Sequence, residues 1–252
     1  MSINEAVFRF YEELNDFLPP EKKKLSFFHA FDGKPSIKDT IESLGVPHTE
    51  IDLILVNGNP VDFSYQLRNG DRVAVYPVFE SFDISKVTKL RNNPLREPAF
   101  ILDVHLGKLA RLLRMLGFDT YYDNRYNDPE IVEQALKEHR IILTRDQGLL
   151  KRKAVTHGYW IRSQHPDKQA AEVIRRFDLF SKVRPLSRCI SCNGMIEKVE
   201  KREVLNRLLP RTIRFYEEFY RCSGCEKVFW RGSHYNKMVM RTEKIAKLAA
   251  SK

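Results

Sequence analysis

The chain has 252 residues, 42% of them hydrophobic and 30% charged, with 43 Lys and Arg against 33 Asp and Glu. This composition excludes a disordered or fibrous protein, and the length allows one or two domains that each bury a core. No apolar run approaches the roughly 18 residues of a membrane-spanning helix, and the segment 51–56, which is apolar except for Asp52, is only as long as a strand, which excludes a membrane protein. The first five residues carry neither the basic start nor the apolar centre of a secretory signal, so we expect a cytoplasmic protein.

The positive charge is unevenly distributed along the chain. Residues 1–97 carry 12 basic and 15 acidic side chains, whereas residues 98–252 carry 31 and 18, so the net charges are −3 and +13. A polyanion such as nucleic acid is therefore expected to be attracted to the later residues, by a force that salt screens. The simpler alternative is a basic surface that only keeps the protein dissolved.

The first 81 residues predict a small α+β domain. Two prolines separate two strand-like segments, and Ser36 and Asp39 have the form of a capping box that opens a short helix ending near Gly45. An Asn-Gly turn follows a third strand, and an Asn-Gly-Asp turn precedes a fourth. The strands are predicted at residues 6–11, 25–31, 51–56 and 73–77.

This pattern resembles the β-grasp fold of ubiquitin and of the ThiS-like sulfur carriers. Those carriers need a flexible Gly-Gly end whose carboxylate is activated, but here the last strand runs on through Val78-Phe79-Glu80. We therefore expect residues 1–81 to be a docking or regulatory module that contacts a protein partner, and not a sulfur carrier.

A second pattern begins after residues 82–98, which contain two prolines among polar residues and are predicted to be a linker. Apolar strands then alternate with amphipathic helices. This alternation predicts an α/β domain over residues 99–185, in which a parallel sheet has helices on both faces. The functional groups of such a sheet lie at the carboxyl ends of its strands. The strands are predicted at residues 99–102, 119–122, 140–144 and 158–162.

Three acids follow this rule. Asp103 comes directly after the first strand, Asp128 opens the helix after the second, and Asp146 lies just past the third. Three carboxylates at one edge of a strongly basic domain predict a cation between them, and hard oxygen ligands suit Mg²⁺ or Mn²⁺. The alternative is that Asp128 and Asp146 only cap their helices. Asp123 and Asp167 are weaker candidates to complete the cluster.

At this point the sequence resembles the PIN-like nucleases, within them the group named for the Mut-seven C-terminal RNase domain. The resemblance rests on Phe100-Ile-Leu-Asp103, on the segment 106–120, on Asn127-Asp128 and on the segment 140–150, and it extends to His234. It implies a metal-dependent ribonuclease with Asp103, Asp128 and Asp146 as its acidic residues, and the β-grasp domain is similar to a frequent companion of that family. PIN nucleases commonly use a fourth acid, which has no secure position here.

Basic and aromatic side chains surround these acids in the sequence. Lys108 and Arg111 are on the helix after Asp103, and Arg145 precedes Asp146, so all three are candidates to hold phosphates. Tyr126 lies in the loop before Asp128 and is the best candidate to stack on an unpaired base. The alternative is that the cations are ordinary solvated surface residues. Another basic run follows at residues 151–153.

All four cysteines form two pairs, Cys189-Ile-Ser-Cys192 and Cys222-Ser-Gly-Cys225. Paired knuckles of this kind predict one tetrahedral, structural Zn²⁺ site, with two disulfides as the alternative. Residues 186–236 are therefore predicted to be a zinc ribbon, whose arginines and aromatic residues suggest a role in positioning RNA. The alternative is that the aromatic residues form a small core. His234 is a possible substrate contact, but a structural role is the more common one for such a histidine, and His105 is likewise expected to be structural. Residues 237–252 predict a basic helical tail.

These features predict a divalent-metal-dependent ribonuclease. Asp103, Asp128 and Asp146 would hold Mg²⁺ or Mn²⁺, Lys108 and Arg111 would be among the cations that clamp RNA, and the zinc ribbon would widen the binding surface. The rival hypothesis is a non-catalytic RNA-binding or adaptor protein whose β-grasp domain docks a partner.

Overall fold

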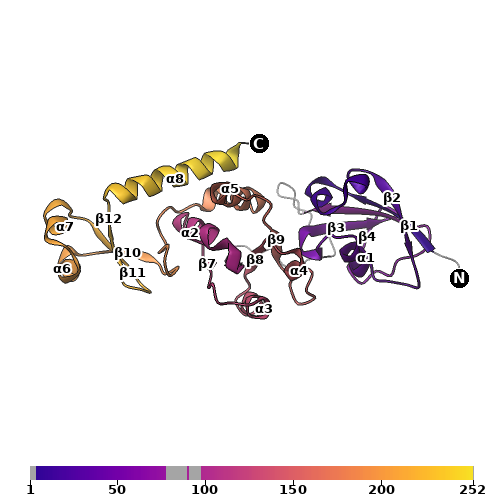
Figure 1. Cartoon of the computed structure of the whole chain (residues 1–252), viewed down its shortest axis with the longest axis horizontal. Coiled ribbons are helices and arrows are strands. Elements are labelled where there is room, and N and C mark those ends of the chain that lie inside the picture. Colours follow the sequence, from indigo (N-terminus) through magenta and orange to yellow (C-terminus); the bar gives the residue numbers. More distant parts are fainter. Residues whose placement is uncertain (1–3, 78–89, 91–97, 252) are drawn as a thin grey trace. The chain divides into compact units, whose positions relative to one another are not determined.

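The computed structural model describes residues 4–77, 90 and 98–251 (Figure 1). By its contacts the chain divides into two compact units, Met1–Arg96 with Asp146–Trp160, and Glu97–Arg145 with Ile161–Lys252. The predicted linker at 82–98 lies outside the described residues, apart from Leu90 and Pro98. Among the residues that are described, no helix combines the length and apolar character needed to span a membrane.

The N-terminal sheet of the first unit has five strands. Its order is β2-β1-β5-β3-β4, with β1 parallel to β5 and antiparallel to β2, and β5 antiparallel to β3. Alternate residues of β1 point inward, because Ala6, Phe8 and Phe10 are buried while Glu5 and Arg9 are exposed. The strands are β1 (Asn4–Phe10), β2 (Ser26–Phe31), β3 (Ile51–Val56), β4 (Asn59–Pro60) and β5 (Arg72–Pro77).

Helix α1 (Ile37–Ser43) begins where the capping box predicts. The backbone N–H of Asp39 donates to Ser36 Oγ at 3.1 Å, and the Ser36 hydroxyl donates to Asp39 Oδ2 at 2.7 Å. Gly45 ends the helix with φ +112°, and a Cβ there would lie 2.9 Å from a backbone oxygen of Phe17, so only glycine fits. Three 3-10 helices complete this part: Glu12–Phe17, Pro20–Lys22 and His48–Glu50.

The second sheet has the order β7-β6-β8-β9, with the central strand β6 parallel to both of its neighbours. Its strands β6 (Phe100–Leu102) and β8 (Ile141–Thr144) are buried throughout, as expected for a parallel sheet covered on both faces. Helices α2 (Gly107–Met115) and α5 (Pro166–Arg176) pack together, and α3 (Asp128–Lys137) contacts β6 and β8 (Figure 1). The remaining elements are a 3-10 helix at Val104–Leu106, β7 (Thr120–Tyr121), α4 (Gln147–Leu150) and β9 (Gly158–Trp160).

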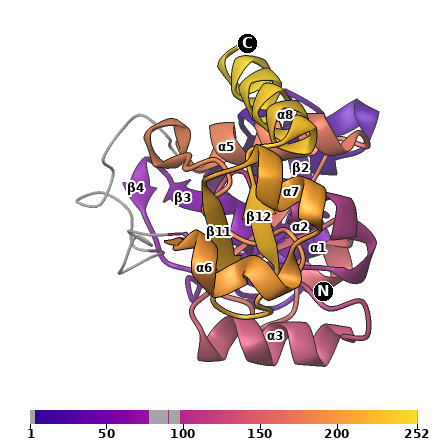
Figure 2. The same cartoon turned by 90° about the vertical axis from the view of Figure 1, so that its left-hand side faces the viewer.

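A three-stranded antiparallel sheet follows, with the order β10-β11-β12. Figure 2 shows β11 and β12 side by side, with short helices at their ends. Helix α8 (Ser233–Ala250) packs on α5 and begins four residues before the predicted tail at 237. The elements are β10 (Ile196–Val199), α6 (Lys201–Val204), α7 (Pro210–Phe215), β11 (Phe219–Cys222) and β12 (Val228–Trp230), with 3-10 helices at Phe180–Lys182 and Leu205–Arg207.

Candidate metal centres

Asp103 follows the last residue of β6 and is only 6% exposed. The hydroxyl of Thr144, the last residue of β8, donates to Asp103 Oδ2 at 2.7 Å, and the backbone N–H of His105 donates to Oδ1 at 3.3 Å. The ends of two neighbouring parallel strands therefore fix this carboxylate. Each of its oxygens has two lone pairs, so each can accept a second partner.

Asp128 is the first residue of α3, but it is not the helix cap. The backbone N–H of Glu130 donates to Asn127 Oδ1 at 3.1 Å, and the N–H of Asn127 donates to Glu130 Oε2 at 2.8 Å. This reciprocal capping box shows that the interpretation of Asp128 as a simple N-cap is wrong. The half-buried Asp128 carboxylate therefore does not cap α3.

Asp146 caps α4, as the alternative interpretation predicts. The backbone N–H of Gly148 donates to Asp146 Oδ1 at 2.7 Å, and the residue is exposed. By its contacts Asp146 opens the segment that is grouped with the first unit, whereas Asp103 and Asp128 belong to the second. Capping occupies one oxygen and does not exclude a metal at the other.

Only one group of three or more His, Cys, Asp or Glu residues in the described part of the chain has all its ligand atoms within 4.8 Å of one another. That group is the four cysteines, and the three aspartates do not form such a group. The acidic metal site therefore stays a prediction.

The two weaker acidic candidates are engaged with cations. Arg125 donates to both oxygens of Asp123, at 3.0 and 2.8 Å, and these hydrogen bonds lower the pKa of Asp123 to about 2. Asp167 pairs with Arg241 at 2.7 Å and with Lys244 at 3.4 Å, which joins α5 to α8. Both carboxylates therefore have structural partners that the sequence pattern did not identify.

The predicted RNA contacts are on the surface, with one exception. Lys108, Arg111 and Arg145 are exposed. The ring of Tyr126, however, stacks on Tyr121 at 5.9 Å, and the two hydroxyls lie 3.1 Å apart. This hydrogen bond raises the pKa of Tyr126 to about 12, and the ring is already in contact with that of Tyr121.

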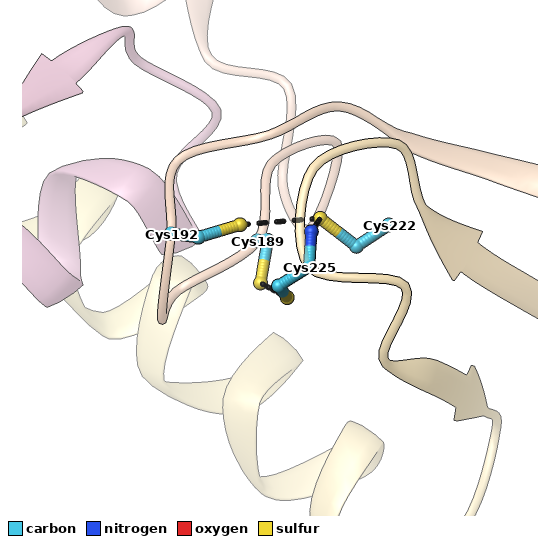
Figure 3. A group of neighbouring side chains, drawn as sticks. All are labelled: Cys189, Cys192, Cys222 and Cys225. Carbon is cyan, nitrogen blue, oxygen red and sulfur yellow. Dashed lines mark hydrogen bonds between the residues drawn. The ribbon is translucent and has the colours of Figure 1, made fainter.

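The four cysteines are free thiols whose sulfur atoms converge (Figure 3). Sγ of Cys189 lies 3.7 Å from that of Cys225, and Sγ of Cys192 lies 3.3 Å from that of Cys222. A tetrahedral Zn²⁺ with bonds of about 2.3 Å would hold sulfurs roughly 3.8 Å apart, so the spacing fits such an ion. The backbone N–H groups of Gly224 and Cys225 also point to Cys222 Sγ, at 3.4 and 3.5 Å.

The environment of Cys225 disfavours its thiolate form unless a positive charge lies nearby. The backbone N–H of Lys227 lowers the pKa of Cys225, but desolvation and the other three thiols outweigh it and raise the pKa to about 12. Four thiolates therefore do not coexist here at neutral pH without a positive charge among them. A metal supplies that charge and displaces the protons.

A polar network joins the first cysteine knuckle to the parallel sheet. The buried Arg114 donates to the carbonyl oxygens of Thr120 and Ser191 at 2.9 and 3.0 Å, and Asn193 Nδ2 donates to Asp119 Oδ1 at 2.9 Å. Burial raises the pKa of Asp119, but Arg140, Asn193 and Arg188 outweigh it, so this pKa is lowered overall. These residues were missed by the sequence analysis, although an arginine between the apolar residues of α2 is a signal for a buried, paired charge.

Known families match both parts of the chain. A family model described as Mut7-C RNAse domain matches residues 98–242, which is more than half of the chain, and one described as Mut7-C ubiquitin matches residues 3–83. No curated protein and no solved structure matches it. The resemblance noted in the sequence is thus confirmed: the chain belongs to the Mut7-C RNAse domain family, with a Mut7-C ubiquitin domain preceding the nuclease domain.

Proposed function

We propose that this protein is a divalent-metal-dependent ribonuclease that hydrolyses phosphodiester bonds of RNA. The observation that carries this proposal is the buried carboxylate of Asp103, which directly follows β6 and accepts a hydrogen bond from Thr144 at the end of β8, within the span matched by the RNAse model. A carboxylate at such a place is costly unless polar partners or a cation accompany it.

The donor set suits a hard divalent ion. Asp103, Asp128 and Asp146 offer only oxygen atoms, which is the ligand type that Mg²⁺ and Mn²⁺ prefer. Such an ion, when bound, activates water and neutralises charge on a phosphate. Thr144 would keep the Asp103 carboxylate in its orientation, because its hydroxyl donates at 2.7 Å.

Exposed cations would hold the RNA strand. Lys108, Arg111 and Arg145 are exposed on the surface, where phosphate oxygens can approach them, and residues 98–252 carry a net charge of +13 that attracts a polyanion. The cysteine cluster would hold Zn²⁺ in a closed, structural site, because all four positions of a tetrahedron are taken by sulfur. The Mut7-C ubiquitin domain would dock a protein partner.

The test is cleavage of a labelled single-stranded RNA with Mn²⁺ or Mg²⁺, using wild type, Asp146→Asn and Asp103→Asn. We expect the wild type to cut and each variant to lose at least about 100-fold in rate, while RNA binding is retained. Asp123→Asn is the matched control, because that acid is paired with Arg125 and should leave the rate unchanged. A DNA strand of the same sequence tests whether the sugar matters.

Two results would contradict the proposal. The first is a wild type that binds RNA but does not cut it with any divalent ion, which would favour the adaptor hypothesis. The second is an Asp146→Asn variant that cuts as fast as the wild type, which would point to a contaminating nuclease.

A further inference from the structure

The cysteine-bearing sheet and the start of α8 enclose a cavity of about 190 Å³. Four aromatic rings line it, and none of them is fully buried; Trp230, for example, is 36% exposed. No predicted metal ligand or phosphate contact lines this cavity. The aromatic residues are Tyr220, Phe229, Trp230 and Tyr235.

A second, wider hollow of about 680 Å³ lies against the same residues. The two hollows share Phe229, Trp230, Tyr235 and Met238 as a common wall, and the second also contains Phe215, which is 65% exposed. We call the two hollows together the ribbon groove. His234, a possible substrate contact in the sequence, lines its wider half.

The size of the smaller cavity limits what it can hold. Drug-sized ligands fill pockets of roughly 300–1,000 Å³, so about 190 Å³ suits a single flat ring. Trp230 and Tyr235 present apolar, partly exposed ring surfaces to it. One planar aromatic group stacked on these rings therefore fits the space and its lining.

The positive charge in and around the groove favours an anionic ligand. The guanidinium of Arg231 lies 6.0 Å from the ring centre of Tyr220 and 5.7 Å from that of Tyr235, and its side chain is 56% exposed. It donates to the Tyr220 hydroxyl at 3.2 Å and approaches Glu218 at 3.5 Å. Residues 186–236 contain ten Lys and Arg against six Glu, so a polyanion is favoured over an uncharged apolar segment.

We infer that the ribbon groove binds unpaired nucleotides of an RNA strand. A base stacks on Trp230 and Tyr235, and the exposed Arg231 contacts a phosphate beside it. A base inside a duplex is covered on both faces, so the groove selects single strands. This inference rests on the proposed function, since it names where the ribonuclease would hold its RNA.

The test uses the emission of Trp230. The chain has two tryptophans, so Trp160→Phe leaves Trp230 as the reporter. A single-stranded oligouridylate is titrated without divalent ions and without a chelator, so that zinc stays bound and the RNA stays intact. We expect saturable quenching of Trp230, and none of Trp160 in the matched Trp230→Phe variant. A duplex of equal length should quench weakly.

Affinity and salt dependence separate stacking from charge. Trp230→Ala should weaken RNA binding by about 5- to 150-fold, with an unchanged dependence on salt, whereas Trp230→Phe should retain most of the affinity. Arg231→Gln should reduce the slope of log affinity against log salt by about 0.7. Phe28→Ala removes an aromatic ring that is 73% exposed on β2 and should change nothing.

The outcomes distinguish this inference from the proposed function. If RNA binds and is cut with Mn²⁺, but neither quenches Trp230 nor depends on it, the groove inference alone is overturned. The exposed rings of the groove would then contact a protein partner instead. Quenching and a Trp230→Ala effect in a protein that cuts nothing overturn the ribonuclease alone. Zinc content measured on each variant shows that the ribbon is still folded.

Discussion

The four cysteines and the three aspartates are both candidate metal ligands, but the molecule holds them in different ways. The cysteines come from two short knuckles in one unit, and their sulfur atoms already lie within 4.8 Å of one another. The aspartates lie at three separate places along the chain, after β6, at the start of α3 and at the start of α4, and are divided between the two units. The cysteine cluster is thus brought together by local turns, whereas each acid depends on its own support.

Those supports differ from acid to acid. Thr144 fixes Asp103, and the segment that begins with Asp146 is held inside the first unit by the N-terminal domain. The backbone N–H of Trp160 donates to Glu50 Oε1 at 2.6 Å, His48 Nε2 donates to the Val155 carbonyl at 2.7 Å, and the Trp160 ring lies 4.9 Å from Phe17. The Mut7-C ubiquitin domain therefore anchors the segment that begins with Asp146, one of the proposed metal ligands.

The largest effect should follow the loss of one cysteine. Cys222→Ser removes a ligand from a site whose metal binding and folding are coupled, with apparent energies of about 10–16 kcal/mol for structural zinc. We expect zinc content to fall from one per chain towards zero, and hydrogen exchange over residues 186–236 to become fast. Ser223→Ala, at the next position, is the control and should keep its zinc. A Cys222→Ser protein with a full zinc complement would contradict the closed site.

Thr144→Val tests the support of Asp103. The substitution keeps the shape but removes the hydroxyl that donates to Asp103 Oδ2, and loss of such a partner costs about 10- to 100-fold in metal affinity. The Mn²⁺ concentration for half-maximal cleavage should rise by this factor, and Thr144→Ser should restore it. Thr242→Val removes another buried hydroxyl, on α8, and should leave the Mn²⁺ dependence unchanged. Equal Mn²⁺ requirements for Thr144→Val and wild type would contradict the proposed role of Thr144 in supporting Asp103.

The sequence predicted those features that depend on neighbouring residues. The Ser36 capping box, the paired cysteine knuckles and the position of Asp103 after an apolar strand all follow from patterns of a few residues. Contacts between distant residues have no such pattern. Asp119 and Asn193 are separated by 74 positions, and neither periodicity nor composition states that they pair.

The same limit explains what was missed at the acidic site. Thr144 ends a strand and was treated as part of it, because only the register between β6 and β8 shows that it faces Asp103. Asn127 was overlooked as the cap of α3 because Asp128 precedes a proline and is an equally good capping residue. The grouping of residues 146–160 with the N-terminal domain rests on contacts between distant residues, such as a hydrogen bond across 110 positions.

Glu50→Ala tests whether that anchor matters. The substitution leaves the N–H of Trp160 without its acceptor, which costs about 1–3 kcal/mol when the group is buried. Urea unfolding should show this loss, and the amide of Trp160 should exchange at least about 5-fold faster. Glu50→Gln keeps an oxygen at the same place and is the matched control. An unchanged exchange rate in the alanine variant would show that the segment is held by other contacts.

The smallest effect is expected at Asp167, an acid held by cations and not by a metal. Burial raises the pKa of Asp167, but Arg241 and Lys244 outweigh it and lower the pKa below 3.8. The unfolded chain therefore takes up the proton first as the pH falls, so the ion pairs stabilise the fold above about pH 3.8 and stop doing so as the pH falls through the lower folded pKa.

Asp167→Asn should thus lower the free energy of unfolding by about 0.5–1 kcal/mol at pH 7, and the difference from wild type should shrink as the pH falls below about 3.8. Urea unfolding of both chains at each pH measures it, with Asp32→Asn, an exposed acid of the first unit, as the control. The Mn²⁺ dependence of cleavage should not change. If instead Asp167→Asn raised the Mn²⁺ requirement, Asp167 would be the fourth acid of the metal site. The metal would then compete with Arg241 and Lys244 of α8 for the Asp167 carboxylate.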